Sequence, residues 1–335
     1  VTLNDGGNTK DSGSTTLTAS ITGTITITAV NDVSVVTAGG ALNYTENGSD
    51  AVIRTPITIT DADDTQIAGA TVTITSGLTT GDVLDFTPQT GITGSYVAES
   101  GILTLSGVKT LAEYQTLLES VTYRSTSEDP TATSTSRTVT WSVIDANSDN
   151  TVATVGSATS TINLTAVNDT PTLAPPAVIA LMDTVADDSF SDSTGTMVGA
   201  DRDSGTTLTY GIANVTVTNG VATKVGTYGT LAVTAATGAY TFTPNAAAIN
   251  ALAANTTETF TVTVSDGTAT TTASYTVNLT AVNDAPALAA IGVSGTEDTT
   301  LTFTAANFTG AYTDPESTAL ASVTVATLPA TGVLK

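Results

Sequence analysis

The sequence predicts an all-β protein built from tandem β-sandwich domains in an extended array. Three observations predict this class: strands in which Thr or Ser alternates with apolar residues, turn signals about every ten residues, and one pentapeptide that returns at domain-length intervals. Many short strands separated by regular turns are typical of sandwiches and not of α/β folds. The length of 335 residues is enough for two or three such domains.

Alternating segments occupy most of the chain. Residues 21–30 (ITGTITITAV), 137–144 (RTVTWSVI) and 273–282 (ASYTVNLTAV) follow the pattern of a strand with one face in a core and the other in water. Thr suits the wet face because its β-branched side chain favours an extended backbone and its hydroxyl stays solvated. We expect the aromatic residues on these strands, Trp141 included, to lie in the core. Two stretches carry helix formers with apolar residues at spacings of three and four, which predicts a short helix in each: 110–121 and 245–254.

The string TAVND divides the chain into domains. It occurs at 28–32, 165–169 and 280–284, and each copy ends an alternating strand and precedes a new extended run. The intervals between the copies are far longer than the roughly 20 to 50 residues of a solenoid repeat, so each interval holds a whole domain. No Gly/Ser tract follows them, which predicts short, stiff junctions. The predicted parts are the closing strands of one sandwich (1–30), two complete sandwiches (31–167 and 168–282) and the opening part of a further sandwich (283–335).

Composition argues against several functional classes. The chain has no Cys and no His, which removes disulfides, thiol nucleophiles, the usual general base and the usual zinc ligands. It carries 31 acidic and 8 basic residues, a net charge of −23 that would repel nucleic acid. No apolar run reaches the roughly 18 to 20 residues of a membrane-spanning helix, and no P-loop or G-x-S-x-G string is present. We therefore expect a secreted, extracellular protein segment that is not an enzyme and has neither a nucleic-acid partner nor a membrane span. Because both ends fall in mid-sheet, Val1 is expected to be an internal position of a longer protein.

Acidic residues recur in the same order around every Asn-Asp pair. A turn before the pair carries an aspartate, a further acid follows roughly 15 residues after the pair, and an Asp-x-Asp or Asp-x-Glu turn lies beyond that acid. The candidate ligands are Asp5, Asp145 and Asp266 in the preceding turns, Asn31 with Asp32, Asn168 with Asp169 and Asn283 with Asp284 in the linkers, Glu46, Asp183 and Glu297 after them, and Asp61 with Asp63, Asp201 with Asp203 and Asp314 with Glu316 in the paired turns. The other acids, such as Asp82, are expected on the solvated surface. At Asp183, the neighbouring Asp187 and Asp188 compete for the same role.

This set of oxygen ligands suits calcium. Calcium takes six to eight oxygens from carboxylates, amides and carbonyls, and no single loop of this chain offers so many. We expect each ion to lie at a domain boundary, where it collects ligands from the last turn of the preceding domain, the Asn-Asp linker, and the first strand and paired turn of the following domain. Without an ion, two carboxylates about 4 Å apart would repel each other by about 4 kcal/mol at an effective dielectric constant near 20. A bound ion would replace that repulsion with attraction to both sides of the boundary, and would thereby fix the angle between domains.

Several motifs together resemble the cadherin-like repeats of large bacterial secreted or surface adhesins, including those of the RTX-adhesin kind. The string TAVNDAP with an acid roughly 15 residues later and a D-x-D/E beyond it is shared with these repeats. Residues 31–167 look like one such subtype, and residues 168–282, with YGTLAVTAATGAYTFTPN and FTVTVSDG, look like a VCBS-type repeat. The resemblance implies Ig-like or cadherin-like sandwiches, an Asn-Asp linker similar to the calcium-binding linker of cadherins, and a place at the cell surface.

Three functions from different classes fit the sequence. The first is a calcium-rigidified rod or stalk of a bacterial surface adhesin or biofilm-matrix protein, whose partners are calcium ions and the neighbouring domains of the same chain. The second is a glycan- or protein-binding module, which should carry an unrepeated exposed patch. The third is a self-assembling extracellular filament or layer, in which the strands of 283–335 pair with those of 1–30 from an identical chain. We favour the first because the acids repeat, and because a tandem array explains both ends more simply.

Overall fold

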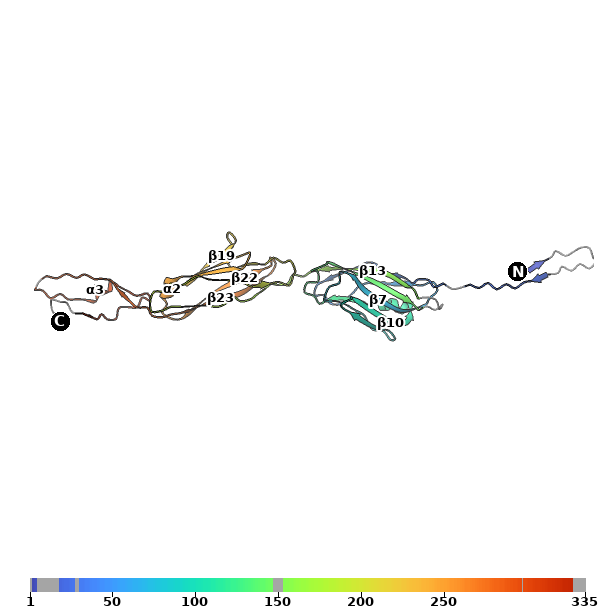
Figure 1. The fold of residues 1–335 in the computed structure, drawn as a ribbon, viewed down its shortest axis with the longest axis horizontal. Helices are drawn as coiled ribbons and strands as arrows, with labels where there is room; N and C mark the ends of the chain where they lie inside the picture. Colours follow the sequence, from blue (N-terminus) through green and yellow to red (C-terminus); the bar gives the residue numbers. More distant parts are fainter. Residues whose placement is uncertain (1, 5–17, 28–29, 147–152, 297, 328–335) are drawn as a thin grey trace, which may run out of the picture. The chain divides into compact units, whose positions relative to one another are not determined.

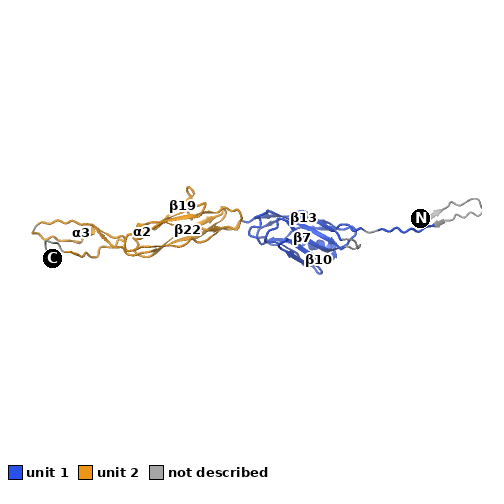
Figure 2. Cartoon of the chain, viewed as in Figure 1, with its two compact units in different colours: residues 1–167 blue, residues 168–335 orange. Residues whose placement is uncertain are grey.

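The computed structural model describes residues 2–4, 18–27, 30–146, 153–296 and 298–327. The chain divides into two compact units, residues 1–167 (unit 1) and 168–335 (unit 2), which are coloured separately in Figure 2. The described residues form 25 strands and three short helices, so the expected all-β class is confirmed. The division into four parts stays a prediction. Within the described residues, no helix combines the length and the apolar character needed to cross a membrane.

Unit 1 contains two facing sheets with one shared core (Figure 1). Its strands are β1 (Thr2–Asn4), β2 (Thr18–Ser20), β3 (Val35–Thr37), β4 (Ala41–Thr45), β5 (Ala51–Val52), β6 (Thr58–Thr60), β7 (Gln66–Ser76), β8 (Asp82–Asp85), β9 (Thr93–Val97), β10 (Ile102–Thr110), β11 (Thr122–Ser125), β12 (Ser136–Asp145) and β13 (Val155–Thr165). The larger sheet has the order β4-β13-β12-β7-β10-β9 and the smaller one the order β5-β11-β8. Two further pairs, β1 with β2 and β3 with β6, form separate two-stranded sheets, and Val36 and Ile59 of the second pair lie in the same core.

The core of unit 1 is filled by alternate residues of both sheets. Trp141 and its neighbours two positions away on β12 are fully buried, and Leu84 and Tyr123 of the smaller sheet belong to the same core. The expectation that Trp141 is a core residue is therefore confirmed. The helix expected at 110–121 is also present as α1 (Leu111–Glu119), which begins with a capping box and buries three side chains in the core.

One acid expected on the surface lies inside unit 1 instead. Asp82 is buried and forms a salt bridge with Arg137, whose Nε lies 2.7 Å from the Asp82 carboxylate, and both side chains are fully enclosed. The Tyr123 hydroxyl and the Thr79 backbone N–H donate to the same carboxylate at 2.6 and 2.8 Å. The surface prediction for Asp82 was wrong because these donors and one cation together replace the water that an isolated carboxylate needs.

Unit 2 contains a second sandwich followed by a less buried segment. Its elements are β14 (Thr172–Leu173), β15 (Ile179–Met182), β16 (Ser193–Thr196), β17 (Gly199–Ala200), β18 (Thr209–Ile212), β19 (Val221–Val225), β20 (Gly229–Thr234), β21 (Ala239–Pro244), α2 (Ala246–Asn250), β22 (Thr256–Ser265), β23 (Thr270–Thr280), β24 (Ala287–Leu288), α3 (Ala305–Thr309) and β25 (Tyr312–Thr313). Two four-stranded sheets, β15-β23-β22-β18 and β16-β21-β20-β19, share one core. The helix expected within 245–254 is present as α2. After Asn283, β24 pairs with β25, and α3 buries no side chain.

In both sandwiches, an early strand pairs in parallel with the last strand. In unit 1, β4 runs parallel to β13 with Tyr44 opposite Leu164. In unit 2, β15 runs parallel to β23 with Leu181 opposite Leu279. Because the paired strands point the same way, the residue after β4 or β15 lies at the end of the sandwich where the last strand also finishes. The hairpin before the last strand lies at the opposite end, since β12 and β22 are antiparallel to their partners.

Candidate cation sites at the ends of the sandwiches

The first site gathers residues from three distant parts of unit 1. The Asn31 Nδ2 donates to the Asp145 carboxylate at 2.9 Å. The Asp32 backbone N–H donates to both carboxylate oxygens of Asp63 at 3.1 and 3.3 Å, and Asp63 N–H in turn donates to Asp61 at 3.2 Å. The linker, the paired turn after β6 and the hairpin between β12 and β13 therefore meet at one end of the sandwich.

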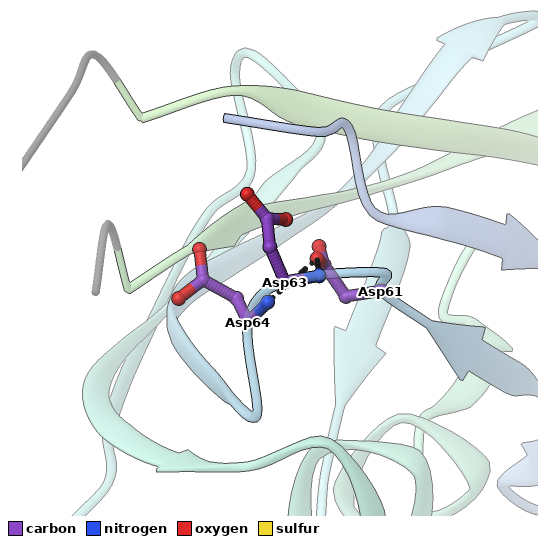
Figure 3. Close-up of side chains that lie close together, drawn as sticks. All are labelled: Asp61, Asp63 and Asp64. Atoms are coloured by element: carbon purple, nitrogen blue, oxygen red, sulfur yellow. Dashed lines mark hydrogen bonds between the residues drawn. The ribbon is translucent and has the colours of Figure 1, made fainter. Parts of the chain in front are cut away.

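Three carboxylates are close enough at this end to hold one ion. One oxygen each from Asp61, Asp63 and Asp64 lies within 4.8 Å of the others, on the turn after β6 (Figure 3). Burial acts to raise the pKa of Asp61, but hydrogen bonds from the Ser34 hydroxyl and the backbone amides of Asp64 and Asp63 hold it below its ordinary value. The Asp32 backbone amide lowers the pKa of Asp63, yet burial and the adjacent carboxyls together raise it. Asp64 was absent from the predicted ligand set, although the run DADD contains it.

Unit 2 repeats the same hydrogen bonds at the corresponding end. The Asn168 Nδ2 donates to the Asp266 carboxylate at 2.9 Å, and the Asp169 backbone N–H donates to Asp203 at 2.8 Å. The Asp203 N–H donates to Asp201 at 2.8 Å, as its counterpart does in unit 1. Hydrogen bonds from the Ala269 backbone and from Asn168 hold the pKa of Asp266 below its ordinary value despite partial burial, so this acid stays ionised over a wider pH range.

The acid that follows each linker by roughly 15 residues lies at the opposite end of its sandwich. Glu46 is buried directly after β4, where its backbone N–H donates to the Thr165 carbonyl at 2.9 Å. Its carboxylate accepts a 2.7 Å hydrogen bond from the Val167 N–H, at the end of the last strand of unit 1. Asp183 holds the equivalent position in unit 2: its N–H donates to the Thr280 carbonyl at 3.1 Å and its carboxylate accepts from Val282 N–H at 3.4 Å.

Asp183, Asp284 and Glu316 form the most enclosed acidic cluster. One carboxylate oxygen from each lies within 4.8 Å of the others. Asp284 is 1% exposed, and neither of its carboxylate oxygens has a hydrogen-bond partner. Its backbone N–H donates to Glu316 at 2.9 Å, which repeats the contact between linker and paired turn seen at the other two linkers. Burial raises the pKa of Asp284, and the charges of Asp183, Glu316, Asp187 and Asp188 raise it further.

This cluster meets the requirements of a cation site. A buried polar group without a partner is costly, and a buried carboxylate without a counter-charge is more so. No cationic side chain is hydrogen-bonded or ion-paired to Asp183, Asp284 or Glu316 in the described part of the chain. The Asn283 Nδ2 donates to the Asp284 carbonyl at 3.0 Å, which directs its amide hydrogens toward the backbone. A divalent cation with oxygen ligands would supply the missing counter-charge.

The grouping of ligands differs from the sequence-based expectation in two respects. Asp145 and Asp266 were expected at the linkers that follow them, but they lie at Asn31 and Asn168, the linkers that begin their own sandwiches. Glu46 and Asp183 were expected at the linkers that precede them, but they lie at the far ends of their domains. The reason is that about 15 residues of extended chain, at roughly 3.3 Å each, cross a whole domain, so nearness in sequence does not imply the same end.

The remaining predicted ligands fall into three groups. Asp314 lies near the cluster in sequence, but its carboxylate accepts from the Tyr312 hydroxyl at 3.2 Å and the Thr318 N–H at 2.9 Å. Of the competitors of Asp183, Asp188 is engaged by the Thr184 N–H at 2.6 Å, and Asp187 lines a neighbouring cavity. Asp5 and Glu297 lie outside the described residues.

Comparisons with known proteins give one partial sequence match and distant structural likenesses. No family model matches the chain. A stretch of 96 residues is 35% identical to Halomucin of Haloquadratum walsbyi and covers 27% of this chain and 1% of that protein. The chain is also similar to the protocadherin gammaB7 EC3-6 cis-dimer structure, at 14% identity, 83% of this chain, 58% of that chain and a TM-score of 0.39. It is also similar to the structure of mouse clustered PcdhgC3 EC1-3, at 12% identity over 84% of this chain and 76% of that chain, with a TM-score of 0.36.

Proposed function

We propose that this chain is a calcium-stiffened segment of an extracellular stalk in a large bacterial surface adhesin or biofilm-matrix protein. The segment has no catalytic role in this proposal. Its sandwiches act as spacers, and calcium ions at their ends hold successive parts of the chain at fixed angles.

The observation that carries this proposal is the buried, unpartnered carboxylate of Asp284. It belongs to the linker, whereas Asp183 belongs to the sandwich before it and Glu316 to the segment after it. An ion bound to all three would tie the two sides of the linker to one point. Without the ion, three like charges would gather where the linker must be held, which favours a more open arrangement.

The donor set supports calcium over the other common metals. Every candidate ligand is a carboxylate or amide oxygen, and the chain has neither the Cys nor the His that zinc and copper prefer. Calcium tolerates irregular sets of six to eight oxygens, whereas magnesium demands near-octahedral geometry and dehydrates reluctantly. A site assembled from separate segments therefore suits calcium, and extracellular modules of this kind bind at about 10⁻⁴ to 10⁻³ M.

Two further features support a stalk. The acidic hydrogen-bond pattern repeats at Asn31, Asn168 and Asn283, as expected for a unit that recurs along a long chain. The matched 96 residues are 1% of Halomucin, so that relative is very long. A net charge of −23 would keep such a chain soluble and would draw calcium to it.

Calcium titration calorimetry combined with small-angle scattering tests the proposal. The whole chain should bind calcium at millimolar concentration or below, and the scattering should change from that of a flexible particle in chelator to that of a stiffer one in calcium. Asp284→Asn should lose part of the binding heat and part of the stiffening. Asp192→Asn removes the same charge from an exposed residue outside the clusters and should behave like the parent. Absence of binding at millimolar calcium would refute the proposal.

A further inference from the structure

The outer face of the larger sheet of unit 1 carries no charged side chain. The charged residues of its six strands are Lys109, Arg137 and Asp145. Arg137 and Asp145 are fully buried, and Lys109 lies opposite the core residue Ile67, so it belongs to the inner face. Because the chain has a net charge of −23, a whole sheet face without charge is a distinct surface.

Hydroxyl groups form rows across this face. One row contains Ser95, Thr104, Thr71, Ser142 and Ser157, which lie opposite one another on β9, β10, β7, β12 and β13. The outer three of these side chains are exposed and the central two are partly exposed. Neighbouring strands are about 4.8 Å apart and alternate residues of one strand about 6.7 Å apart, so the hydroxyls form a regular array.

Apolar side chains flank this row on both sides. Val97 lies opposite Ile102 in the row toward one end of the sandwich, and Ile144 lies opposite Val155 in the row toward the other end. Val97, Ile144 and Val155 are 47, 37 and 56% exposed. A partner seated on this face would remove these side chains from water, which favours association.

The outer face of the smaller sheet of unit 1 is different. Arg124 lies there and forms an ion pair with Asp50 at 3.3 Å, and Asp85 lies opposite Thr122 on the same side. The two outer faces of one sandwich therefore differ in charge. The absence of charge from the larger sheet is a property of that face and not of every strand in the unit.

The larger sheet is wide enough for a stable interface. Four of its six strands are nine to eleven residues long, so its face measures on the order of 800 Å². A standard protein interface buries about 800 Å² on each partner. Each main sheet of unit 2 has four strands and offers less area.

We propose that two copies of this chain associate laterally through the outer faces of their larger sheets. Two copies that approach by this face bring no charges into contact, whereas acidic surfaces would oppose an approach elsewhere. Identical twisted sheets can pack face to face, and a two-fold axis would make the contact self-complementary. The inference is independent of the proposed cation sites, because none of their ligands lies on this face.

A neutral glycan is the alternative occupant, and the face suits it less well. The aromatic residues of the six strands are Tyr44, Tyr96 and Trp141. Tyr44 and Trp141 are buried, and Tyr96 lies opposite the core residue Leu103 and donates its hydroxyl to the Asp82 carbonyl at 2.8 Å. All three lie on the inner face, so the outer face of these strands has no ring on which a sugar could stack.

Sedimentation equilibrium of the whole chain in chelator tests the proposal. The parent should form a dimer whose dissociation constant falls as sodium chloride is added, because salt screens the repulsion between two chains of charge −23. Thr140 lies between Thr73 and Thr159 near the centre of the face. Thr140→Glu and Thr140→Lys should each raise the dissociation constant by about tenfold or more, because each places a charge against its own copy. Since Lys lowers the net charge, general repulsion would not explain its effect.

Thr122→Glu is the matched control, because it makes the same substitution on the outer face of the smaller sheet and should leave the dimer unchanged. Trp141 fluorescence during urea unfolding checks that the variants are folded. If Thr140→Glu unfolds unit 1, Thr104→Glu repeats the test at an exposed position of the same face.

Three results would overturn the inference. The first is a parent that stays monomeric at every protein and salt concentration. The second is a dimer that both charged variants of Thr140 leave unchanged, or one that weakens as salt is added, since such a contact depends on opposite charges. The third is a monomeric parent that is retarded on a cross-linked dextran gel while Thr140→Glu is not, which would assign the face to a neutral glycan.

Discussion

Calcium should stabilise unit 2 against heat, and Asp284→Asn should remove part of that effect while stabilising the calcium-free protein. The sign follows from the cluster: in chelator, Asp284 is a buried carboxylate with no partner, so a neutral amide of the same shape relieves repulsion from Asp183 and Glu316. If the cluster binds calcium as proposed, the same carboxylate is a ligand in calcium, and its loss weakens the site. The substitution should therefore have opposite effects on stability in the two conditions.

The size of the calcium effect follows from linkage. At about 10 mM calcium, a site with a dissociation constant of about 10⁻⁴ to 10⁻³ M contributes roughly 1.4 to 2.7 kcal/mol to the stability of the folded unit. For a unit the size of residues 168–335, each kcal/mol moves the melting temperature by about 2 to 4 °C. Saturation of one site should thus raise the melting temperature by about 3 to 11 °C.

Differential scanning calorimetry of the whole chain measures this shift. Trp141 is the only tryptophan and lies in unit 1, so its fluorescence identifies the unit 1 transition and leaves the other transition to unit 2. The second ligand cluster of unit 2, near Asn168, contributes equally to parent and variant and cancels in their difference. If calcium raised the melting temperature of Asp284→Asn as much as that of the parent, the cluster would not be the calcium site.

Three further predictions concern stability. Asp82→Asn leaves its arginine partner charged and buried, and should cost unit 1 about 3 to 5 kcal/mol in urea unfolding followed by Trp141 fluorescence; an unchanged midpoint would contradict the ion pair. In chelator, the melting temperature of unit 2 should fall as pH rises above 3.8. Burial and neighbouring acids raise the pKa of Asp284, so above this pH the folded state still holds a proton that the unfolded state has released. A melting temperature that rises with pH above 3.8 would contradict this reasoning. Gly156→Ala places a Cβ that would clash with the Ser34 carbonyl oxygen, so β13 must shift, and urea unfolding should show a loss of about 1 to 3 kcal/mol; a variant as stable as the parent would contradict this close packing.

Local patterns in the sequence were sufficient for most of the strands and the main core residues. The strand expected at 21–30 was wrong: the described residues 21–27 form no strand and are exposed, with Ile25 and Ile27 each 88% exposed, because alternation alone does not supply a partner strand. The alternation in 137–144 places Trp141 on the buried face of β12, and the structure confirms it. The spacing in 110–121 predicts α1 for the same reason, since helix periodicity is a local property. The linker and paired-turn acids were predicted as ligands from their recurrence, which depends only on residue type and order, and their role as ligands stays a prediction.

Which acids share an end could not be read from spacing. Glu46 follows Asn31 closely in sequence but lies beside Val167, because β4 pairs in parallel with β13. Asp145 precedes Asn168 in sequence but lies beside Asn31. It is the last residue of β12, and because β12 runs antiparallel to β13, it lies where β13 begins, at the opposite end from Asn168. Strand pairing is a long-range property, and one strand length is enough to reverse the assignment.

Buried polar groups were the other features that sequence reasoning missed. Asp82 lies in the segment GDVLD, and no residue near it in the sequence indicates that it pairs with Arg137, which is 55 residues away. Asn250 lies in an alanine-rich helix that reads as a simple connection between strands. Each is recognisable only when the fold shows what surrounds the side chain, because burial and the count of available donors are not local quantities.

The most direct test of the cation clamp is a crystal structure of the whole chain grown with calcium, or with terbium in its place, and measured at a wavelength that locates the metal by anomalous scattering. The account predicts a peak at about 2.3 to 2.6 Å from carboxylate oxygens of Asp183, Asp284 and Glu316. Electron density in which these oxygens contact only water or protein donors, at saturating metal, would contradict it.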